Sequence, residues 1–261
     1  MSVILSFELA GRLARLTLSR PEAKNALRPV DWQQLAAHLS EVQQRPEVRV
    51  VLLSGAGGAF SSGGDLKTMP ERLALPVAAR RQQLLADSRV IQTLYDLDLP
   101  VVAAIPGVCM GAGLSLALAA DLRIAASNAV LGAVFHRIGL SADFGLSWLL
   151  PQAVGAAQAM RLLMTAATVS ADEALALGLV QTVVAPAELE SAAQALCQQL
   201  AQGPKVAQAL TKRALHRSST ADLAAMLEWE AHSQSLLGKT PDAQEGLTAF
   251  LTKRPPHFQE D

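Results

Sequence analysis

Residues 99–120 read LPVVAAIPGVCMGAGLSLALAA, a run of apolar and small residues without one charged side chain. A hydropathy window would mark this run as a membrane span. However, two prolines and three glycines interrupt it, and Asp98 and Asp121 flank it. Residues 100–107 instead fit a short buried strand that ends in a turn, and Gly113 opens a buried helix. A strand, a glycine turn and a helix in this order predict an α/β fold and no membrane segment.

Strand and helix patterns continue to alternate on both sides of this run. Residues 7–9 and 13–18 alternate apolar with polar side chains around a Gly-Arg pair, which predicts a hairpin. A helix opens at Pro29, where apolar residues begin to recur every three to four positions. Short β-branched or apolar runs predict further strands at 48–53, 101–105, 123–125 and 179–184.

From about residue 190 the pattern changes to a succession of helices with apolar stripes. The expected breaks fall at Gly203-Pro204 and at residues 238–241. We therefore divide the chain into a core at residues 1–190 and a helical region at residues 191–261. Such a region must bury its apolar faces on the core or on another subunit.

Composition excludes several classes of protein. The 261 residues carry 22 basic and 23 acidic side chains, so no basic excess favours nucleic-acid binding. A hydrophobic content of 51% excludes disorder. Cys109 and Cys197 provide neither a disulfide scaffold nor a zinc site, and the N-terminus reaches Glu8 too early for a signal peptide. We expect a soluble, cytoplasmic protein without a metal.

Two glycine-rich turns follow predicted strands, GAGGAFSSGGD at residues 55–65 and GVCMGAG at residues 107–113. The first is not a P-loop, because Gly64-Asp65 replaces the lysine and hydroxyl residue that phosphate and magnesium require. The second has its glycines at the wrong offsets for a dinucleotide site. Small residues instead expose main-chain N–H groups, and two of these on one carbonyl oxygen form an oxyanion hole. The alternative is that the glycines only permit tight turns and close packing.

Taken together, seven stretches resemble the crotonase superfamily, the enoyl-CoA hydratases and isomerases. The resemblance implies a spiral of ββα units with a C-terminal helical trimerisation region, assembled as trimers or dimers of trimers. It also implies an acyl-CoA thioester whose carbonyl oxygen accepts hydrogen bonds from the N–H groups of Gly64 and Ala112. The stretches occur in the family's order over nearly the whole chain, at residues 20–27, 59–66, 105–113, 120–125, 137–140, 171–180 and 246–251.

The same resemblance implies contacts to coenzyme A, which enters as part of the substrate, and no separate cofactor. Without the resemblance, Lys24 and Lys253 would be read as surface charges and Asp65 as a helix cap. The implied contacts are Lys24 and Ala26 at the adenine and pantetheine end, Ser62, Asp65 and Leu66 along the arm, and Phe250 and Lys253 toward a neighbouring subunit's coenzyme A.

Departures from the family pattern bear on the reaction. Hydratases of the family activate water with two glutamates, whose positions correspond here to Ser115 and Phe135. A general acid and a general base each commonly accelerate a reaction by ~10² to 10⁴. The loss of both glutamates therefore disfavours water addition. The loop GLSADFG at residues 139–145 resembles that of family isomerases, in which one acid, here Asp143, is the base. Asp143 could otherwise cap a helix that begins at Gly145.

We therefore expect an acyl-CoA isomerase that shifts a double bond, or opens a small ring, by proton transfer through Asp143. The nearest subgroup is the Δ3,Δ2-enoyl-CoA isomerases together with the ring-epoxide isomerase of phenylacetate breakdown. A free aspartate near pKa 3.9 is a weak base, so its surroundings should raise the pKa by desolvation. Phe144, large where the family has a small residue, would narrow the acyl pocket. The alternatives are a hydratase of fatty-acid or aromatic-acid degradation, with Asp143 handling water alone, and a non-catalytic acyl-CoA-binding oligomer.

Overall fold

The computed structural model describes residues 2–259, apart from the side chain of Leu9, as a mixed α/β fold. A six-stranded sheet has the order β1-β2-β3-β4-β6-β9, and every neighbouring pair in it except β1 and β2 is parallel. A smaller sheet has the order β5-β7-β8. The strands are β1 (Val3–Glu8), β2 (Leu13–Leu18), β3 (Val50–Gly55), β4 (Val101–Ile105), β5 (Val108–Met110), β6 (Leu122–Ala126), β7 (Val130–Gly132), β8 (Thr168–Ser170) and β9 (Thr182–Val184).

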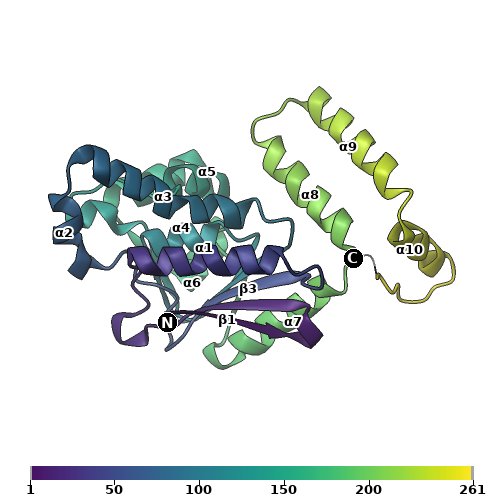
Figure 1. Ribbon diagram of the computed structural model, residues 1–261, viewed down its shortest axis with the longest axis horizontal. Coiled ribbons are helices and arrows are strands. Elements are labelled where there is room, and N and C mark those ends of the chain that lie inside the picture. The colour runs from purple at the N-terminus through teal and green to yellow at the C-terminus, as the bar shows by residue number, and fades with distance from the viewer. Residues whose placement is uncertain (1, 260–261) are drawn as a thin grey trace.

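Helices cover both faces of the larger sheet (Figure 1). One apolar core packs α1, α3, α4 and α5 against one face, and a second core packs α7 against the other. Burial on both faces explains why the parallel strands are continuous apolar runs. The helices are α1 (Pro29–Gln43), α2 (Met69–Ala74), α3 (Val77–Tyr95), α4 (Ala112–Leu118), α5 (Leu146–Thr165), α6 (Ala171–Leu177), α7 (Leu189–Ala201), α8 (Lys205–Ser218), α9 (Leu223–Leu237) and α10 (Pro241–Leu251).

The uncharged run at residues 99–120 forms β4, β5 and α4 in the centre of the molecule. The expected strand and the expected helix are both confirmed, whereas the three-residue strand β5 between them was not anticipated. So short a strand has little pattern of its own and is defined by its pairing with β7. None of the helices in the described part of the chain combines the length and apolar character that a bilayer crossing requires.

Gly107, in the turn between β4 and β5, allows two backbone segments to touch. A Cβ at this position would overlap the carbonyl oxygen of Gly58, and neither backbone can move away freely. We expect Gly107→Ala to lower the free energy of unfolding by about 1–3 kcal/mol, the usual range for overpacking. Urea denaturation checks this, with Gly64→Ala as the control because a Cβ there meets no atom within 4 Å. Equal stability of the two variants would contradict the close approach.

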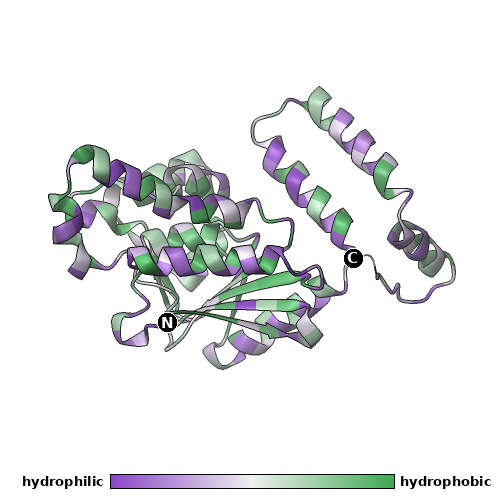
Figure 2. Ribbon diagram, viewed as in Figure 1, coloured by the Kyte–Doolittle hydropathy of each residue, from purple (hydrophilic) through white to green (hydrophobic). Residues whose placement is uncertain are grey.

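The C-terminal helices separate into two parts. The division expected at residues 190/191 falls inside α7, which packs on the sheet and so lies with the core. The part outside the sheet core begins at α8, which contacts the core through Lys212 and His216, while α9 lies along its outer side and α10 lies beyond (Figure 1). Apolar residues alternate with polar ones along these helices (Figure 2). Seven large apolar side chains there are exposed: Leu215, Leu223, Leu227, Leu236, Leu247, Phe250 and Leu251.

Candidate active site

The two glycine-rich turns lie against each other, although about fifty residues separate them in the sequence. The Phe60 and Ser61 N–H groups both donate to the Val108 carbonyl at 3.0 Å, and the Met110 N–H donates to the Ser61 carbonyl at 2.9 Å. A Cβ at Gly63, where φ is +96°, would lie 2.9 Å from the Met110 oxygen and 3.6 Å from the Ala112 nitrogen. Glycine at 63 therefore permits the contact that brings Gly64 and Ala112 to one place.

The N–H groups of Gly64 and Ala112 are available as donors. Around Gly64, the Leu27 N–H donates to the Gly63 carbonyl at 2.8 Å and the Asp65 N–H donates to the Leu27 carbonyl at 2.9 Å. Among the described residues, the Gly64 N–H itself makes no backbone hydrogen bond. Ala112 is the first residue of α4, so its N–H has no acceptor within the helix. Both residues line the same cavity.

This cavity has a volume of about 300 Å³ and mostly apolar walls. Asp143 is the one carboxylate among the described residues that line it, and Arg72, Arg80 and Arg137 are the cations. The apolar lining comes from Trp32, Leu66, Met69, Leu84, Met110, Val134, Phe135, Ile138, Leu140 and Phe144. The structure therefore brings together the three residues expected to be catalytic, Gly64, Ala112 and Asp143.

Asp143 lies in the loop before α5 and is held there through its main chain. Its carbonyl accepts from the Leu146 N–H at 3.1 Å and from the Ser115 Oγ at 3.3 Å. Its Oδ1 is buried and accepts no hydrogen bond from the described residues. Burial raises the pKa of the carboxyl to about 6, outweighing the nearby positive charges of Arg72 and Arg80, which lower it. The N-cap of α5 is Gly145, and among the described residues no α5 N–H donates to the Asp143 carboxylate, which argues against the helix-cap interpretation of Asp143.

The raised pKa has a consequence for stability. The folded protein binds this proton more tightly than the unfolded chain, so the carboxyl destabilises the fold as pH rises from 3.8 to about 6. We expect Asp143→Asn to be more stable than wild type at about pH 8, by up to about 3 kcal/mol, and the difference to vanish near pH 4. Urea denaturation at the two pH values measures this. A constant difference between the proteins would rule out a perturbed carboxyl.

Aromatic side chains line the same cavity as Asp143. Phe144 has a left-handed backbone, with φ at +50°, and its ring stacks on Trp32 with centroids 4.4 Å apart. A β-carbon-bearing residue rarely adopts this conformation, which requires support from its surroundings. Phe144 lines the cavity together with Asp143, and its effect on the width of the acyl pocket stays a prediction.

The positions of the family's two hydratase glutamates hold no acid. Ser115 is fully buried on α4, and its Oγ donates a hydrogen bond to the main-chain carbonyl of Asp143. The Phe135 ring lines the cavity, and a Cβ at Gly111 would lie 3.7 Å from it. Phe135 therefore makes the cavity wall apolar where the resemblance implies a carboxylate in hydratases.

The expected coenzyme A contacts are only partly assembled. Ser62 and Leu66 line the cavity, and the Ser62 N–H donates to the Lys24 carbonyl at 2.9 Å, which places the Lys24–Ala26 segment beside it. Asp65 is buried, and its carboxylate accepts hydrogen bonds from other residues of the chain. It accepts from Arg20 Nη2 at 2.6 Å, and from the Lys67 N–H at 3.0 Å as the cap of a short 3₁₀ turn.

Phe250 and Lys253 do not line the cavity of their own chain. Phe250 is 80% exposed on α10, and Lys253 is exposed just after it, in the part that extends from the core (Figure 1). Their role at a neighbouring subunit remains a prediction.

Comparison with known proteins identifies a family and several relatives of similar length. A family model described as enoyl-CoA hydratase/isomerase matches residues 8–261. The chain is 41% identical to a "Probable enoyl-CoA hydratase" of Rhodobacter capsulatus over 255 residues, 97% of each chain. It is 36% identical to the 1,2-epoxyphenylacetyl-CoA isomerase of Escherichia coli over 262 residues, 99% of this chain and 98% of that one. The crystal structure of enoyl-CoA hydratase from Bacillus anthracis superposes with a TM-score of 0.93 at 30% identity, covering 100% of both chains.

The chain belongs to the enoyl-CoA hydratase/isomerase family. The resemblance inferred from the seven sequence stretches is thereby confirmed, and so is the crotonase-like α/β fold. The relatives include proteins named hydratase and a protein named isomerase, so membership in the family leaves the reaction open.

Sequence patterns missed several residues that line this family member's cavity. Met69 and Arg72 come from α2, and Arg80 and Leu84 from α3. The spacing of Leu84, Ile91 and Leu94 was the signal for a helix at this point. Which face of that helix meets the glycine turns depends on the tertiary packing.

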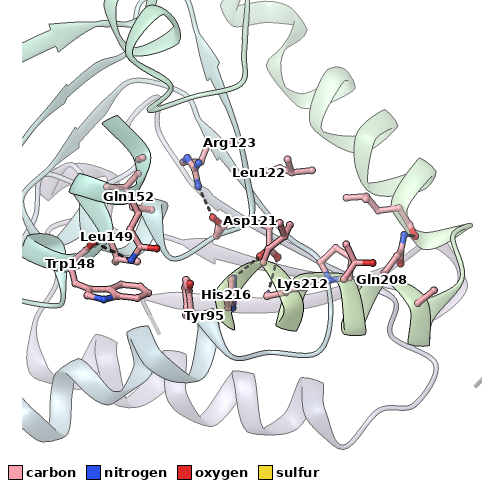
Figure 3. Close-up of a pocket in the computed structure, with 18 of the residues that line it drawn as sticks. Tyr95, Asp121, Leu122, Arg123, Trp148, Leu149, Gln152, Gln208, Lys212 and His216 are labelled. Carbon is pink, nitrogen blue, oxygen red and sulfur yellow. Dashed lines mark hydrogen bonds and ion pairs between the residues drawn. The ribbon is translucent and has the colours of Figure 1, made fainter. Parts of the chain in front are cut away.

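A larger cavity, of about 570 Å³, lies between α8 and the core and shares no lining residue with the first (Figure 3). Several of its polar side chains already form an ion pair, hydrogen bonds or ring contacts within the chain. Lys212 Nζ pairs with Asp121 at 2.9 Å and donates to the Leu99 carbonyl at 3.1 Å, and the His216 ring stacks on Tyr95 (Figure 3). These contacts join α8 to the core. The described residues contain no group of three or more His, Cys, Asp or Glu placed to hold a metal ion.

Proposed function

We propose that this protein is an acyl-CoA isomerase that shifts a double bond, or opens a small ring, by proton transfer through Asp143. The observation that carries the proposal is one carboxylate with a buried oxygen, the only one among the described residues that line this cavity, together with two free main-chain donors. Bond migration needs one group that removes and returns the same proton. Water addition ordinarily needs a separate acid and base.

In the proposed reaction, the thioester oxygen accepts hydrogen bonds from the Gly64 and Ala112 N–H groups. Asp143 takes a proton from C2 of a 3-enoyl thioester, and the electron pair of the C–H bond moves into a dienolate whose negative oxygen those donors stabilise. The protonated Asp143 then delivers the proton to C4, and the double bond forms between C2 and C3. The carboxylate returns to its ionised form, so no co-reactant is consumed.

Coenzyme A is proposed to lie along Ser62 and Leu66, with Lys24 and Ala26 toward its adenine end. Phe250 and Lys253 would complete the site from another subunit of a homo-oligomer, a trimer or a dimer of trimers. Support for this part comes from the exposed apolar residues of α8, α9 and α10, which no other segment within residues 2–259 covers.

The second candidate is a hydratase in which Asp143 activates water alone. It is favoured by the similarity to proteins named hydratase. Purified protein given 3-enoyl-CoA and 2-enoyl-CoA separately in deuterated water distinguishes the candidates. An isomerase converts the 3-enoyl ester and incorporates deuterium at C2 or C4. A 3-hydroxyacyl product from the 2-enoyl ester would favour the hydratase, and binding without exchange would indicate a non-catalytic oligomer.

The pH dependence of isomerisation is a further test. Asp143 must be ionised to accept the C2 proton, and its pKa is about 6. We expect kcat/KM to rise tenfold per pH unit below about pH 6 and to level off above it. Initial rates with 3-enoyl-CoA in buffers of constant ionic strength give the profile. A profile already flat at about pH 4 would mean that a group with an ordinary pKa, or no carboxylate, limits the rate.

A further inference from the structure

Arg20 joins the segment that contains Ala26 to the glycine-rich turn that contains Gly64. It lies between β2 and a 3₁₀ turn at Pro21–Ala23, and its side chain is 18% exposed. Its Nη1 donates to the Ala26 carbonyl at 2.8 Å, and its Nη2 donates to the Asp65 carboxylate at 2.6 Å. A guanidinium is planar and holds its donors in a rigid fork, so bonds to two acceptors fix the distance between them.

These two acceptors adjoin a backbone pair, Leu27 and Gly64, which forms an isolated parallel bridge. In this bridge the Leu27 N–H donates to the Gly63 carbonyl at 2.8 Å, and the Asp65 N–H donates to the Leu27 carbonyl at 2.9 Å. Two consecutive glycines leave the peptide between them unusually free to rotate. The bridge and the guanidinium together restrict that rotation, and so fix the direction in which the Gly64 N–H points.

The main chain of Arg20 is connected to the same turn by a second route. Its N–H donates to Asn25 Oδ1 at 2.8 Å, and Asn25 Nδ2 donates to the Ala59 carbonyl at 2.7 Å. The Ser61 Oγ donates to the Asn25 carbonyl at 2.8 Å and accepts from the Gly63 N–H at 3.1 Å. Asn25 and Ser61 are buried, where hydrogen bonds are electrostatically stronger than in water. The segment that begins at Arg20 therefore holds the turn on both sides of the donor.

Arg20 is not among the described residues that line the cavity, so a direct contact with the thioester is not expected. Its bond to Asp65 is charged on both sides. Burial raises the pKa of Asp65, but hydrogen bonds from Arg20 and from the Lys67 N–H outweigh burial and bring the pKa below its ordinary value. The other carboxylate oxygens near Arg20 are further away, Glu22 Oε1 at 3.6 Å and Asp31 Oδ2 at 3.9 Å. A short bond between two charged groups is about twice as strong as a neutral one, which suits it to hold a turn in place.

We propose that Arg20 is a positioning residue, which through the Asp65 carboxylate and the Ala26 carbonyl fixes the Gly64 N–H as a donor to the thioester oxygen. This inference rests on the proposed function for the role of that N–H. Negative charge on the oxygen develops in the transition state, so a misdirected donor lowers kcat more than it raises KM. Because a displacement of about 1 Å can cost about 10²-fold in rate, we expect a loss of about 10- to 10²-fold when Arg20 no longer holds the turn.

Kinetics of matched variants test the proposal. Arg20→Met should lower kcat for 3-enoyl-CoA by that factor and change KM by less than about threefold. Arg20→Lys, which keeps the charge without the fork, should recover part of the loss. Arg15→Met is the control and should keep the wild-type kcat. Arg15 is similarly buried, but it pairs with Glu8 and Glu190, away from the glycine turns.

Two further variants keep the test valid if Arg20→Met is unstable, since removal of one partner of a buried ion pair destabilises a protein. Asp65→Asn keeps the shape of the acceptor and removes its charge, so kcat should fall in the same direction. Combining Asp65→Asn with Arg20→Lys should cost less than the sum of the two single losses, because both changes weaken one bond.

Infrared spectroscopy detects the donor directly and requires no turnover. Hexanoyl-CoA, with an isotope label at the thioester carbonyl carbon, is bound to each protein, and the carbonyl stretching frequency is measured by difference. Hydrogen bonds to the oxygen lower this frequency. We expect the lowest values in wild type and Arg15→Met and a higher value in Arg20→Met, with Gly64→Pro as the reference for a missing donor. A purely structural role of Arg20 would lower the melting temperature and leave the frequency of the bound ester unchanged.

The outcomes distinguish this proposal from the proposed function. If folded Arg20→Met keeps both the kcat and the carbonyl frequency of wild type, the proposal is wrong. It is also wrong if Arg20→Met weakens free coenzyme A and hexanoyl-CoA equally at an unchanged frequency, since Arg20 would then organise contacts to coenzyme A. If the frequency responds to Arg20→Met and Gly64→Pro but wild type does not isomerise, the reaction is refuted and the positioning role stands. Equal frequencies in wild type and Gly64→Pro would refute both.

Discussion

Asp143→Asn is expected to lower the rate of 3-enoyl-CoA isomerisation by about 10²- to 10⁴-fold, the usual contribution of a general base. The amide has nearly the same shape but takes no proton at neutral pH. Asp143 is the one carboxylate lining the cavity among the described residues, so no neighbour can replace it. Its loop is held through the main chain, by Leu146 and Ser115, so the substitution leaves the loop's anchoring intact.

Deuterium exchange at C2 and C4, followed by NMR, measures this loss directly. The affinity for a saturated acyl-CoA should be retained, because the carboxylate is not among the expected contacts to coenzyme A. Asp96→Asn serves as the control, since Asp96 is an exposed residue outside this cavity. Exchange within about threefold of wild type in Asp143→Asn would eliminate Asp143 as the base.

Gly64→Pro is expected to lower kcat by about 10²- to 10³-fold, the usual effect of removing one oxyanion-hole donor. Proline removes the N–H, and in the described structure no backbone hydrogen bond uses that N–H. Gly64→Ala is the matched control. It retains the donor, and its Cβ meets no atom within 4 Å, so its activity should remain close to that of wild type.

The comparison depends on Gly64→Pro folding normally. Its melting temperature and its affinity for free coenzyme A should therefore be measured beside the rate. If a well-folded Gly64→Pro protein keeps more than about a tenth of wild-type activity, the Gly64 N–H does not stabilise the oxyanion. If Gly64→Ala loses as much activity as Gly64→Pro, the effect comes from the added atoms and not from the lost donor.

Local patterns were sufficient for much of the fold. The apolar stripes from about residue 190 predicted a succession of helices, and the structure has α7, α8, α9 and α10 there, with a break at Gly203-Pro204 as expected. The hairpin was also predicted, from its alternation of apolar and polar side chains, and the central strands were predicted from their apolar runs, because both patterns are properties of neighbouring residues. The short strands β5, β7 and β8 have only three residues each, and their pairing with one another decides them.

The candidate site, like the fold, was predicted from the sequence in part and was decided by the tertiary structure in part. The sequence by itself determined which residues we propose to carry the chemistry, since the turns containing Gly64 and Ala112 and the loop containing Asp143 are recognisable from their own residues. Only the tertiary structure decided that these three segments line one cavity, that Asp65 is engaged by Arg20, and that Arg72 and Arg80 enter from α2 and α3. The reason is physical. Turn and helix preferences act over a few residues, whereas burial, pKa and the partner of a charge depend on segments that packing brings together from distant parts of the chain.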